Sequence, residues 1–415
     1  MNSSFERYAL KAPTVLLPDE TIDLKKWAVV ACDQYTAQPE YWESVCALVG
    51  DAPSALNIIY PEAWLHQGDG RIAGVNRAME EYRASVLTRR IEGFILMERE
   101  ISAGNRLGLI AAVDLEQYDY GADSKSLIRA TEGTILERIP PRVRIRENAA
   151  LESPHVLMLV DDPDQTLIEP VHAARDRLEP LYDFDLMLGG GRVRGWRVDG
   201  AAQAVMLAAL ARLNERARGL LYAVGDGNHS LAAAKAHWRA LRETLPECER
   251  ADHLARYALV EIGNLHDSSL VFEPIHRVLS GVGAEALFRA LREWLRGRGM
   301  DLADASGGGI MFSLVGDGVR PLRIDPIDRS LPLSILQEFL DVYLCNHPGV
   351  EIDYVHGDDV AFGLAGENSC SLLLKPSEKA NLFESVRAGG ALPRKAFSMG
   401  EAREKRYYLE CREIR

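Results

Sequence analysis

The sequence has few cysteines and no long apolar run. Its six cysteines are scattered over 415 residues without a C-x-x-C pair, a distribution that favours reduced thiols over a disulfide framework or a structural zinc site. No window approaches the roughly 18 uninterrupted apolar residues of a membrane span. The first residues also lack the charged-then-apolar build of a signal peptide. These absences predict a cytoplasmic protein with no membrane partner.

Positive charge is in the minority. The chain has 48 Lys and Arg residues against 61 Asp and Glu residues, a formal net charge of −13. A field of this sign repels a polyanion, so we expect no nucleic-acid partner. The hydrophobic share of 47% and the charged share of 26% are those of an ordinary globular protein, which excludes disorder and coiled coil. Composition does not predict an oligomeric state.

Short apolar runs alternate with segments of helical period, and the length suggests two or three domains. Such runs are typical of buried strands; they are Trp27–Cys32, Gly93–Met97, Leu107–Val113, His155–Val160, Leu220–Val224 and Ala258–Ile262. The sequence predicts an α/β domain over residues 1–283, a mixed sheet with covering helices, and a smaller α+β C-terminal domain over residues 284–415. In the second domain we expect strands at Ile310–Val315 and Cys370–Leu374, and helices over Leu333–Leu344 and from Ser377.

The strongest local pattern is a buried strand, a glycine turn and a helix start. The turn has the sequence Gly225-Asp226-Gly227-Asn228-His229-Ser230. A turn of this kind leaves backbone N–H groups at the positive end of a helix, where a phosphate or carboxylate binds. His229 adds a donor that titrates near neutrality, and Asp226 could hold a metal ion or accept a proton. The spacing is neither Walker A nor G-x-G-x-x-G. The alternative is that Asp226 or Ser230 only caps the helix and that His229 lies on the surface.

In its context the turn resembles the Asp-Gly-His-His-Arg loop of a large prokaryotic family, the domain of unknown function numbered one thousand and fifteen. Four further motifs occur in the order of that family: Ala31-Cys32-Asp33-Gln34-Tyr35, Arg129-Ala130-Thr131-Glu132-Gly133-Thr134, Phe272-Glu273-Pro274-Ile275-His276-Arg277-Val278 and Leu392-Pro393-Arg394-Lys395. On these motifs the chain is identified as a member of the family, over nearly its whole length.

The family loop is in turn similar to the phosphate-gripping turn of the ParB/sulfiredoxin superfamily, which includes nucleotide-using partition proteins, sulfiredoxin and kinases of free serine. The resemblance implies that Gly225, Gly227, Asn228 and Ser230 bind phosphate, with ATP or ADP and Mg²⁺ as cofactors. The present sequence has Asn228 and Ser230 where the family has its first His and its Arg. One cationic phosphate partner is therefore missing, and another basic residue must replace it.

Arginines near the Thr131-Glu132-Gly133-Thr134 motif are candidates for that replacement. They are Arg129, Arg142 and Arg144, with Arg146 beyond. On a strand, Arg142, Arg144 and Arg146 would share one face, where a phosphorylated ligand would relieve their mutual repulsion. The alternative is a solvated edge strand whose arginines pair with neighbouring glutamates.

Two carboxylates are predicted to take part in the chemistry. Glu132 stands where the family has a carboxylate in an Arg-His-Glu-x-Thr pattern, and it could act as general base on a hydroxyl; a structural ion pair is the alternative. Asp33, at the end of the first predicted strand, is a candidate metal ligand together with Asp226. An ordinary turn aspartate is the alternative there.

Further basic residues follow later in the chain. His276 and Arg277 come after a predicted strand over Leu270–Phe272, and alternation on a strand would send them to opposite faces, with His276 favoured at the site. Lys395, and then Lys405 with Arg406, lie in a glycine-flanked C-terminal region that could cover an anion.

These patterns predict an enzyme that binds a nucleotide or another phosphorylated small molecule, and that transfers a phosphoryl group to serine or a related hydroxylated metabolite. The serine part is implied only by the superfamily resemblance. Two other classes stay open: a ParB-like regulator or DNA-binding protein switched by a nucleotide, and a metabolite-binding protein without catalysis.

Overall fold

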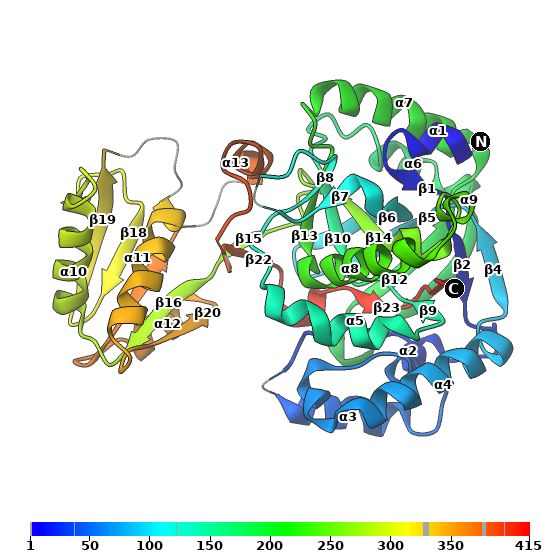
Figure 1. The fold of residues 1–415 in the computed structure, drawn as a ribbon, viewed down its shortest axis with the longest axis horizontal. Helices are drawn as coiled ribbons and strands as arrows, with labels where there is room; N and C mark the ends of the chain where they lie inside the picture. Colours follow the sequence, from blue (N-terminus) through cyan, green and yellow to red (C-terminus); the bar gives the residue numbers. More distant parts are fainter. Residues whose placement is uncertain (1, 37, 122, 327–331, 376–378, 394) are drawn as a thin grey trace. The chain divides into compact units, whose positions relative to one another are not determined.

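The computed structural model describes residues 2–36, 38–121, 123–326, 332–375, 379–393 and 395–415 (Figure 1). The chain folds as two compact units, one of Met1–Val271 with Gly400–Arg415 and one of Phe272–Met399. The predicted division into 1–283 and 284–415 has one boundary, whereas the observed division has two, after Val271 and before Gly400. The first unit ends earlier, and the C-terminal segment returns to it because its short strands pair with strands of that unit.

The first unit is built on a ten-stranded mixed sheet. Its path runs through β11 (Glu179–Asp185), β12 (Arg192–Arg197), β5 (Ile95–Ile101), β6 (Gly104–Asp114), β14 (Tyr257–Asn264), β10 (Leu157–Val160), β13 (Tyr222–Asp226), β8 (Ile128–Ala130) and β7 (Tyr118–Asp119), while β1 (Leu10–Lys11) pairs with β6. The pairs β10–β14, β13–β8 and β7–β8 are parallel and the others antiparallel. The predicted mixed sheet is thereby confirmed.

Helices cover both faces of this sheet, because most of its strands are apolar on both faces. One face carries α1 (Asn2–Glu6), α6 (Glu169–Ala173), α7 (Gly200–Arg216) and α8 (Asn228–Thr244). The other carries α2 (Leu24–Trp27), α3 (Pro39–Val49) and α4 (Asp69–Ser85). Two further helices of this unit are α5 (Ile139–Glu147), which contacts α8, and α9 (Glu247–Arg250).

Short strand pairs complete the first unit. They are β2 (Thr14–Leu17) with β4 (Arg89–Glu92), β3 (Val29–Val30) with β23 (Tyr407–Tyr408), and β9 (Leu151–Glu152) with β24 (Arg412–Glu413). The predicted strand over Trp27–Cys32 is shortened to β3, because Trp27 ends the helix α2.

Buried charges attach the C-terminal segment to the large sheet. The Glu261 carboxylate on β14 accepts a hydrogen bond from Nε of Arg106 at 3.1 Å and lies 3.3 Å from Nη1 of Arg406. Arg406 also pairs with Glu410, which accepts a hydrogen bond from the Tyr182 hydroxyl. All five side chains are buried. The C-terminal segment therefore forms part of the core of the first unit.

The second unit has its own antiparallel sheet of six strands. Their order is β17 (Asp301–Asp304), β19 (Val319–Asp325), β18 (Phe312–Val315), β21 (Ser369–Leu374), β16 (His276–Ser280) and β20 (Glu351–Val355). The helices α10 (Ala284–Arg296) and α11 (Pro332–Asn346) pack on it, and the unit also contains α12 (Asp358–Leu364), α13 (Leu382–Gly389) and the pair β15 (Phe272–Pro274) with β22 (Phe397–Met399). The predicted start of a helix at Ser377 lies outside the described residues.

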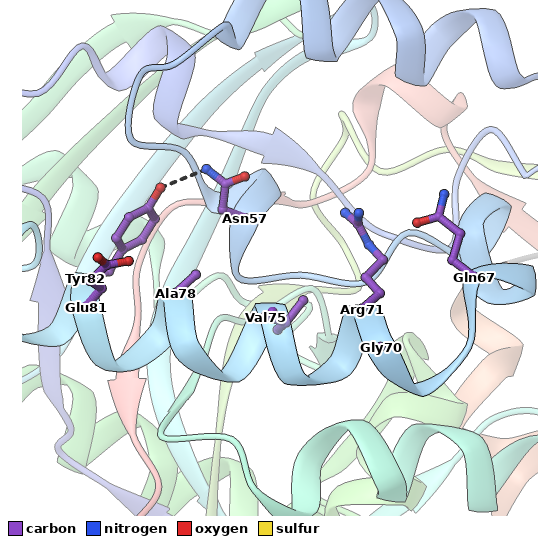
Figure 2. Close-up of a pocket in the computed structure, with 9 residues that line it drawn as sticks. Asn57, Gln67, Gly70, Arg71, Val75, Ala78, Glu81 and Tyr82 are labelled. Atoms are coloured by element: carbon purple, nitrogen blue, oxygen red, sulfur yellow. Dashed lines mark hydrogen bonds between the residues drawn. The ribbon is translucent and has the colours of Figure 1, made fainter.

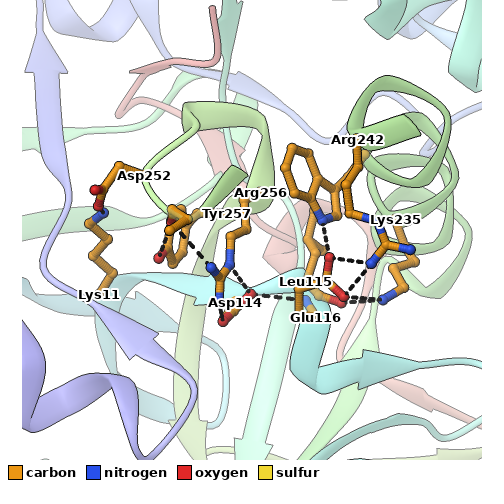
Figure 3. Close-up of polar contacts among 11 residues, drawn as sticks. Lys11, Asp114, Leu115, Glu116, Lys235, Arg242, Asp252, Arg256 and Tyr257 are labelled. Carbon is orange, nitrogen blue, oxygen red and sulfur yellow. Dashed lines mark hydrogen bonds and ion pairs between the residues drawn. The ribbon is translucent and has the colours of Figure 1, made fainter. Parts of the chain in front are cut away.

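Helix α8 is fixed against the edge of the large sheet by polar contacts that Figure 3 shows. The Glu116 carboxylate, just after β6, accepts hydrogen bonds from Nε1 of Trp238 at 2.6 Å and from Nη1 of Arg242 at 2.8 Å. Buried Lys235 donates to the Leu115 carbonyl at 2.6 Å. These contacts hold the body of the helix, and with it the position of its first turn. No helix among the described residues is long and apolar enough to cross a membrane.

Candidate functional site

The turn between β13 and α8 requires glycine at position 227. Gly227 is the N-cap of α8 and has left-handed backbone angles, φ 80° and ψ 24°. A Cβ atom at this position would lie 3.0 Å from Cα of Val156, so a larger residue would be both strained and crowded. No side chain of the described residues caps the helix. The first turn of α8 therefore presents backbone N–H groups at the positive end of a 17-residue helix.

Asp226 ends β13 and is held by a lysine from the C-terminal segment. One carboxylate oxygen lies 3.1 Å from Nζ of Lys405, and the other accepts a hydrogen bond from the Gly227 amide at 2.9 Å. Burial alone would raise the pKa of Asp226. The Lys405 ammonium, with smaller contributions from His155 and the Gly227 amide, outweighs that effect and lowers the pKa below its ordinary value. Asp226 is therefore a carboxylate anion at neutral pH.

A line of polar groups joins this turn to the first predicted motif. His155, just before β10, shares a hydrogen bond of 2.7 Å between its Nδ1 and the hydroxyl of Tyr408. The same hydroxyl accepts a hydrogen bond from the Cys32 amide at 3.3 Å. Burial, with smaller contributions from Cys32 and Asp33, raises the pKa of Tyr408 well above its ordinary value, so the phenol keeps its proton at neutral pH. Burial and the neighbouring Asp33 carboxylate raise the pKa of the Cys32 thiol to about 12.

The segment that contains Glu132 runs beside the turn. Strands β8 and β13 are parallel, with Ala130 opposite Val224, so the segments that follow the two strands begin at the same edge of the sheet. The Thr131 hydroxyl donates to the Val224 carbonyl at 2.6 Å, and the Ile135 amide donates to Nε2 of His229 at 3.2 Å. Glu132 lies between Thr131 and Ile135 in the sequence, and its side chain is half-buried. The structure thus brings together the segments of Glu132, Asp226 and His229.

Asn228 and His229 differ from their expected roles. Nε2 of His229 accepts a hydrogen bond from a backbone amide, so this nitrogen is not a free donor for phosphate. Nδ2 of Asn228 donates to the Val224 carbonyl at 3.3 Å, while its Oδ1 atom is buried without a hydrogen-bond partner among the described residues. Gly225 and Ser230 are partly exposed in the same turn. The turn therefore offers backbone donors and one side-chain acceptor.

The arginines proposed to replace the missing cation are placed differently from the prediction. Arg142, Arg144 and Arg146 lie on the helix α5 and not on a strand. Residues two apart on a helix do not share a face, and the Pro140-Pro141 start suits a first helical turn. Arg142 pairs with Glu62, and Arg146 pairs with Glu152 at 2.5 Å. The predicted cluster of three guanidinium groups on one face is thus wrong.

Arg129 is also used elsewhere. It is buried on β8, and its guanidinium donates to the carbonyls of Ser126 and Gly219 at 3.0 Å each. Gly219 precedes β13, at the opposite end of that strand from the turn. Arg129 therefore contacts backbone away from the predicted phosphate site.

Three predicted residues belong to the second unit. His276 and Arg277 are buried on β16, where Nδ1 of His276 accepts a hydrogen bond from the Leu374 amide at 3.1 Å and Arg277 contacts the Gln337 side chain at 3.3 Å. Lys395 is exposed and has a positive φ of 57°, while Arg394 lies outside the described residues. These contacts of His276 and Arg277 lie within the second unit. They give no support for a phosphate-binding role of either residue.

Sequence reasoning missed His155 and Tyr408 and did not pair Lys405 with Asp226. Lys405 was visible only as part of a basic C-terminal region, and His155 only as the first residue of a predicted strand. Nothing in the sequence pattern connects these residues, because the hydrogen bond between His155 and Tyr408 spans 253 positions. These residues meet because the C-terminal segment returns to the first unit and brings Lys405 to Asp226 and Tyr408 to His155.

Asp33 and Asp226 are the two predicted metal ligands. Within the part of the chain that the structure describes, no group of three or more His, Cys, Asp or Glu side chains is arranged to hold a metal. Mg²⁺ bound to phosphate oxygens needs only one or two protein carboxylates. Both oxygens of Asp226 are already engaged by Lys405 and Gly227. Asp33, whose carboxylate accepts a hydrogen bond from its neighbour Gln34, fits this role better than Asp226.

Replacing Lys405 by Met is expected to raise the pKa of Asp226, because burial then acts without the nearby positive charge. In the wild type the lowered folded-state pKa stabilises the fold above the unfolded-state pKa of about 3.9, and that contribution is lost as the pH falls through the folded-state value. Carboxyl NMR titration of ¹³C-labelled aspartate, assigned with Asp226→Asn, measures the shift. Lys11→Met, which removes the 3.3 Å pair with exposed Asp252, is the control. An unchanged Asp226 titration in Lys405→Met would contradict the ion pair.

Comparisons with known proteins give one matching family and several solved structures of low similarity. Its residues 16–387 match the profile of a family described as protein of unknown function (DUF1015). A free serine kinase mutant in complex with AMP has 12% sequence identity and a TM-score of 0.40, covering 72% of this chain and 90% of its own. A conserved hypothetical protein from Pyrococcus furiosus has 11% identity and a TM-score of 0.37, with 74% and 95% covered. SbnI from Staphylococcus aureus, truncated at its C-terminus, has 10% identity and a TM-score of 0.39, with 70% and 82% covered. The comparison with curated proteins gave no match.

Proposed function

From the premise that the chain belongs to the DUF1015 family, we propose that the turn between β13 and α8 binds the phosphate of a nucleotide or another phosphorylated small molecule. The observation that carries the proposal is the uncapped start of α8 with Lys405 beside it. Backbone N–H groups at a helix N-terminus and a nearby ammonium are the features that bind phosphate. Lys405 supplies the positive charge that the Asn228 and Ser230 replacements remove from the family loop.

We further propose that the protein is a phosphotransferase of the cytoplasm. Phosphoryl transfer depends mainly on positioning and charge neutralisation. In this scheme the amides of Asn228 and His229 and the Lys405 ammonium hold phosphate, and Glu132 takes the proton of the acceptor hydroxyl. Asp33 would hold Mg²⁺, which neutralises phosphate charge when it is bound. The buried Oδ1 atom of Asn228 can accept a hydrogen bond from a hydroxyl group of the ligand.

Binding measurements test the phosphate site. We expect ATP or ADP to bind the wild type and to raise the free energy of unfolding by about 2.7 kcal/mol at a concentration 100 times the Kd. Lys405→Met should weaken that binding at least tenfold, because a charge-assisted contact is worth roughly 1.5–3 kcal/mol. Calorimetric titration with ATP, ADP, CTP, phosphoserine and serine measures it, with Lys11→Met as control.

Three outcomes of these titrations, combined with a turnover assay, would be decisive. Equal affinities of Lys405→Met and wild type would remove Lys405 from the site. No binding of any phosphorylated compound would overturn the proposal. Binding without turnover on serine and other hydroxylated acceptors would identify a metabolite-binding protein instead of an enzyme.

A further inference from the structure

Helix α4 borders a groove (Figure 2), and no residue of the turn between β13 and α8 is among its lining residues. The groove has a volume of about 610 Å³, which lies in the range of small-molecule pockets, roughly 300–1,000 Å³. Gly70 and Gly74 form part of its floor, and a Cβ atom added at either glycine would meet no atom within 4 Å. Val75 and Ala78 continue the apolar floor along the helix. The groove is thus open enough for an organic molecule.

Among the groove's lining residues, Arg71 carries the positive charge, and Glu81, about three helical turns further along α4, carries the negative one. Figure 2 shows its side chain rising from the first turn of α4, next to Gln67. The guanidinium carbon lies 4.1 Å from the centre of the Trp64 ring and 5.6 Å from that of Tyr60. Its Nε atom is buried and has no hydrogen-bond partner among the described residues. No carboxylate of the described residues forms an ion pair with it, and the groups that act on its pKa besides burial, which lowers it, are Tyr60 and Cys46.

This arrangement is costly for the free protein. A half-buried charge without a counter-ion loses hydration that no partner replaces. Arg71 also stands in the first turn of α4, where the helix dipole disfavours positive charge. Arg83, near the other end of the same helix, has the usual arrangement, with Glu80 at 2.8 Å. An anion in the groove would relieve both costs of Arg71.

We propose that this groove binds an organic oxyanion, a small-molecule carboxylate or phosphate ester, whose charged group pairs with Arg71 and whose body lies along Gly70 and Gly74. The planar guanidinium, held against Trp64, presents donors that match a carboxylate or phosphate in two parallel hydrogen bonds. The side chain of Gln67 lines the same groove and offers a further polar group to a ligand. The volume and the apolar floor fit a ligand with a carbon body better than an inorganic ion.

Calorimetric titration with citrate, 3-phosphoglycerate, phosphoserine and inorganic phosphate tests the site and separates carboxylate from phosphate chemistry. We expect an organic probe to bind the wild type and to bind Arg71→Gln at least tenfold more weakly. Without ligand, Arg71→Gln should melt at the same temperature as the wild type or higher, because an uncompensated charge has been removed. A purely structural arginine would give a lower melting temperature instead.

Gly74→Leu provides a second variant that does not alter the charge. The open space at Gly74 accommodates the side chain, and leucine favours a helix more than glycine does. This variant should therefore fold stably and lose the probe because the groove is filled. Arg83→Gln is the control for every probe, and Lys405→Met is the control for citrate, which carries no phosphate. Both should keep the groove affinity, so that a failure of the phosphate site is distinguished from a failure of this one.

The result is unambiguous in either direction. Loss of binding in Arg71→Gln and Gly74→Leu, with both controls unchanged, supports the proposal. The proposal is overturned if no organic probe binds the wild type at the highest concentrations that the titration allows. Equal binding by Arg71→Gln and wild type, or by Gly74→Leu and wild type, places the probe elsewhere and also overturns it.

Discussion

Replacing Glu261 by Gln is expected to lower the free energy of unfolding by about 3–5 kcal/mol, because it leaves buried Arg106 without its counter-charge and leaves Arg406 with Glu410 alone. The Glu261 side chain is fully buried between Arg106 and Arg406. Its volume is nearly unchanged by the substitution, so the effect reports the lost charge and not a cavity. Gly108 makes the room for this carboxylate, since a Cβ atom there would lie 2.8 Å from Cγ of Glu261.

Urea unfolding of the full chain measures this loss. Glu285→Gln serves as a matched control, because it removes the same charge from an exposed pair with Arg320 at 3.1 Å. Exposed pairs contribute about 0–1 kcal/mol. A loss as small as that of the control would show that Arg106 and Arg406 find water or other acceptors, and that the C-terminal segment is held by its apolar contacts alone.

Glu132→Gln is expected to reduce phosphoryl transfer by about 10²–10⁴-fold while leaving the Kd for ATP or ADP nearly unchanged. The reason is that a positioned general base contributes a factor of this size to the rate, whereas the proposed phosphate contacts come from the start of α8 and from Lys405. This prediction depends on the proposed phosphotransferase activity. Single-turnover rates and calorimetric affinities measure the two quantities separately.

Glu137→Gln is the control for this variant, because Glu137 is an exposed carboxylate of the same segment, in the short helix η4 (Leu136–Arg138). It should leave both rate and affinity unchanged. A parallel loss of rate and affinity in Glu132→Gln would assign Glu132 to ligand binding. An unchanged rate would exclude it as the base and leave a structural role.

The local patterns of the chain determined much of the framework. The apolar runs Leu107–Val113 and Ala258–Ile262 lie within β6 and β14, and the predicted helix over Leu333–Leu344 lies within α11. These predictions succeed because a strand or helix buried on a sheet shows its period in the sequence. The prediction failed for Arg142, Arg144 and Arg146, where alternation suggested a strand but the consecutive prolines begin a helix.

The sequence by itself determined the turn from Gly225 to Ser230, because a strand, a left-handed glycine and a helix are set by residues next to one another. Only the tertiary structure decided which charges meet there. The C-terminal segment returns to the first unit and pairs Lys405 with Asp226, and Tyr408 with His155. Arg71 likewise lies against aromatic rings and forms no ion pair with a carboxylate of the described residues. Such contacts depend on how distant segments pack, and no local period records them.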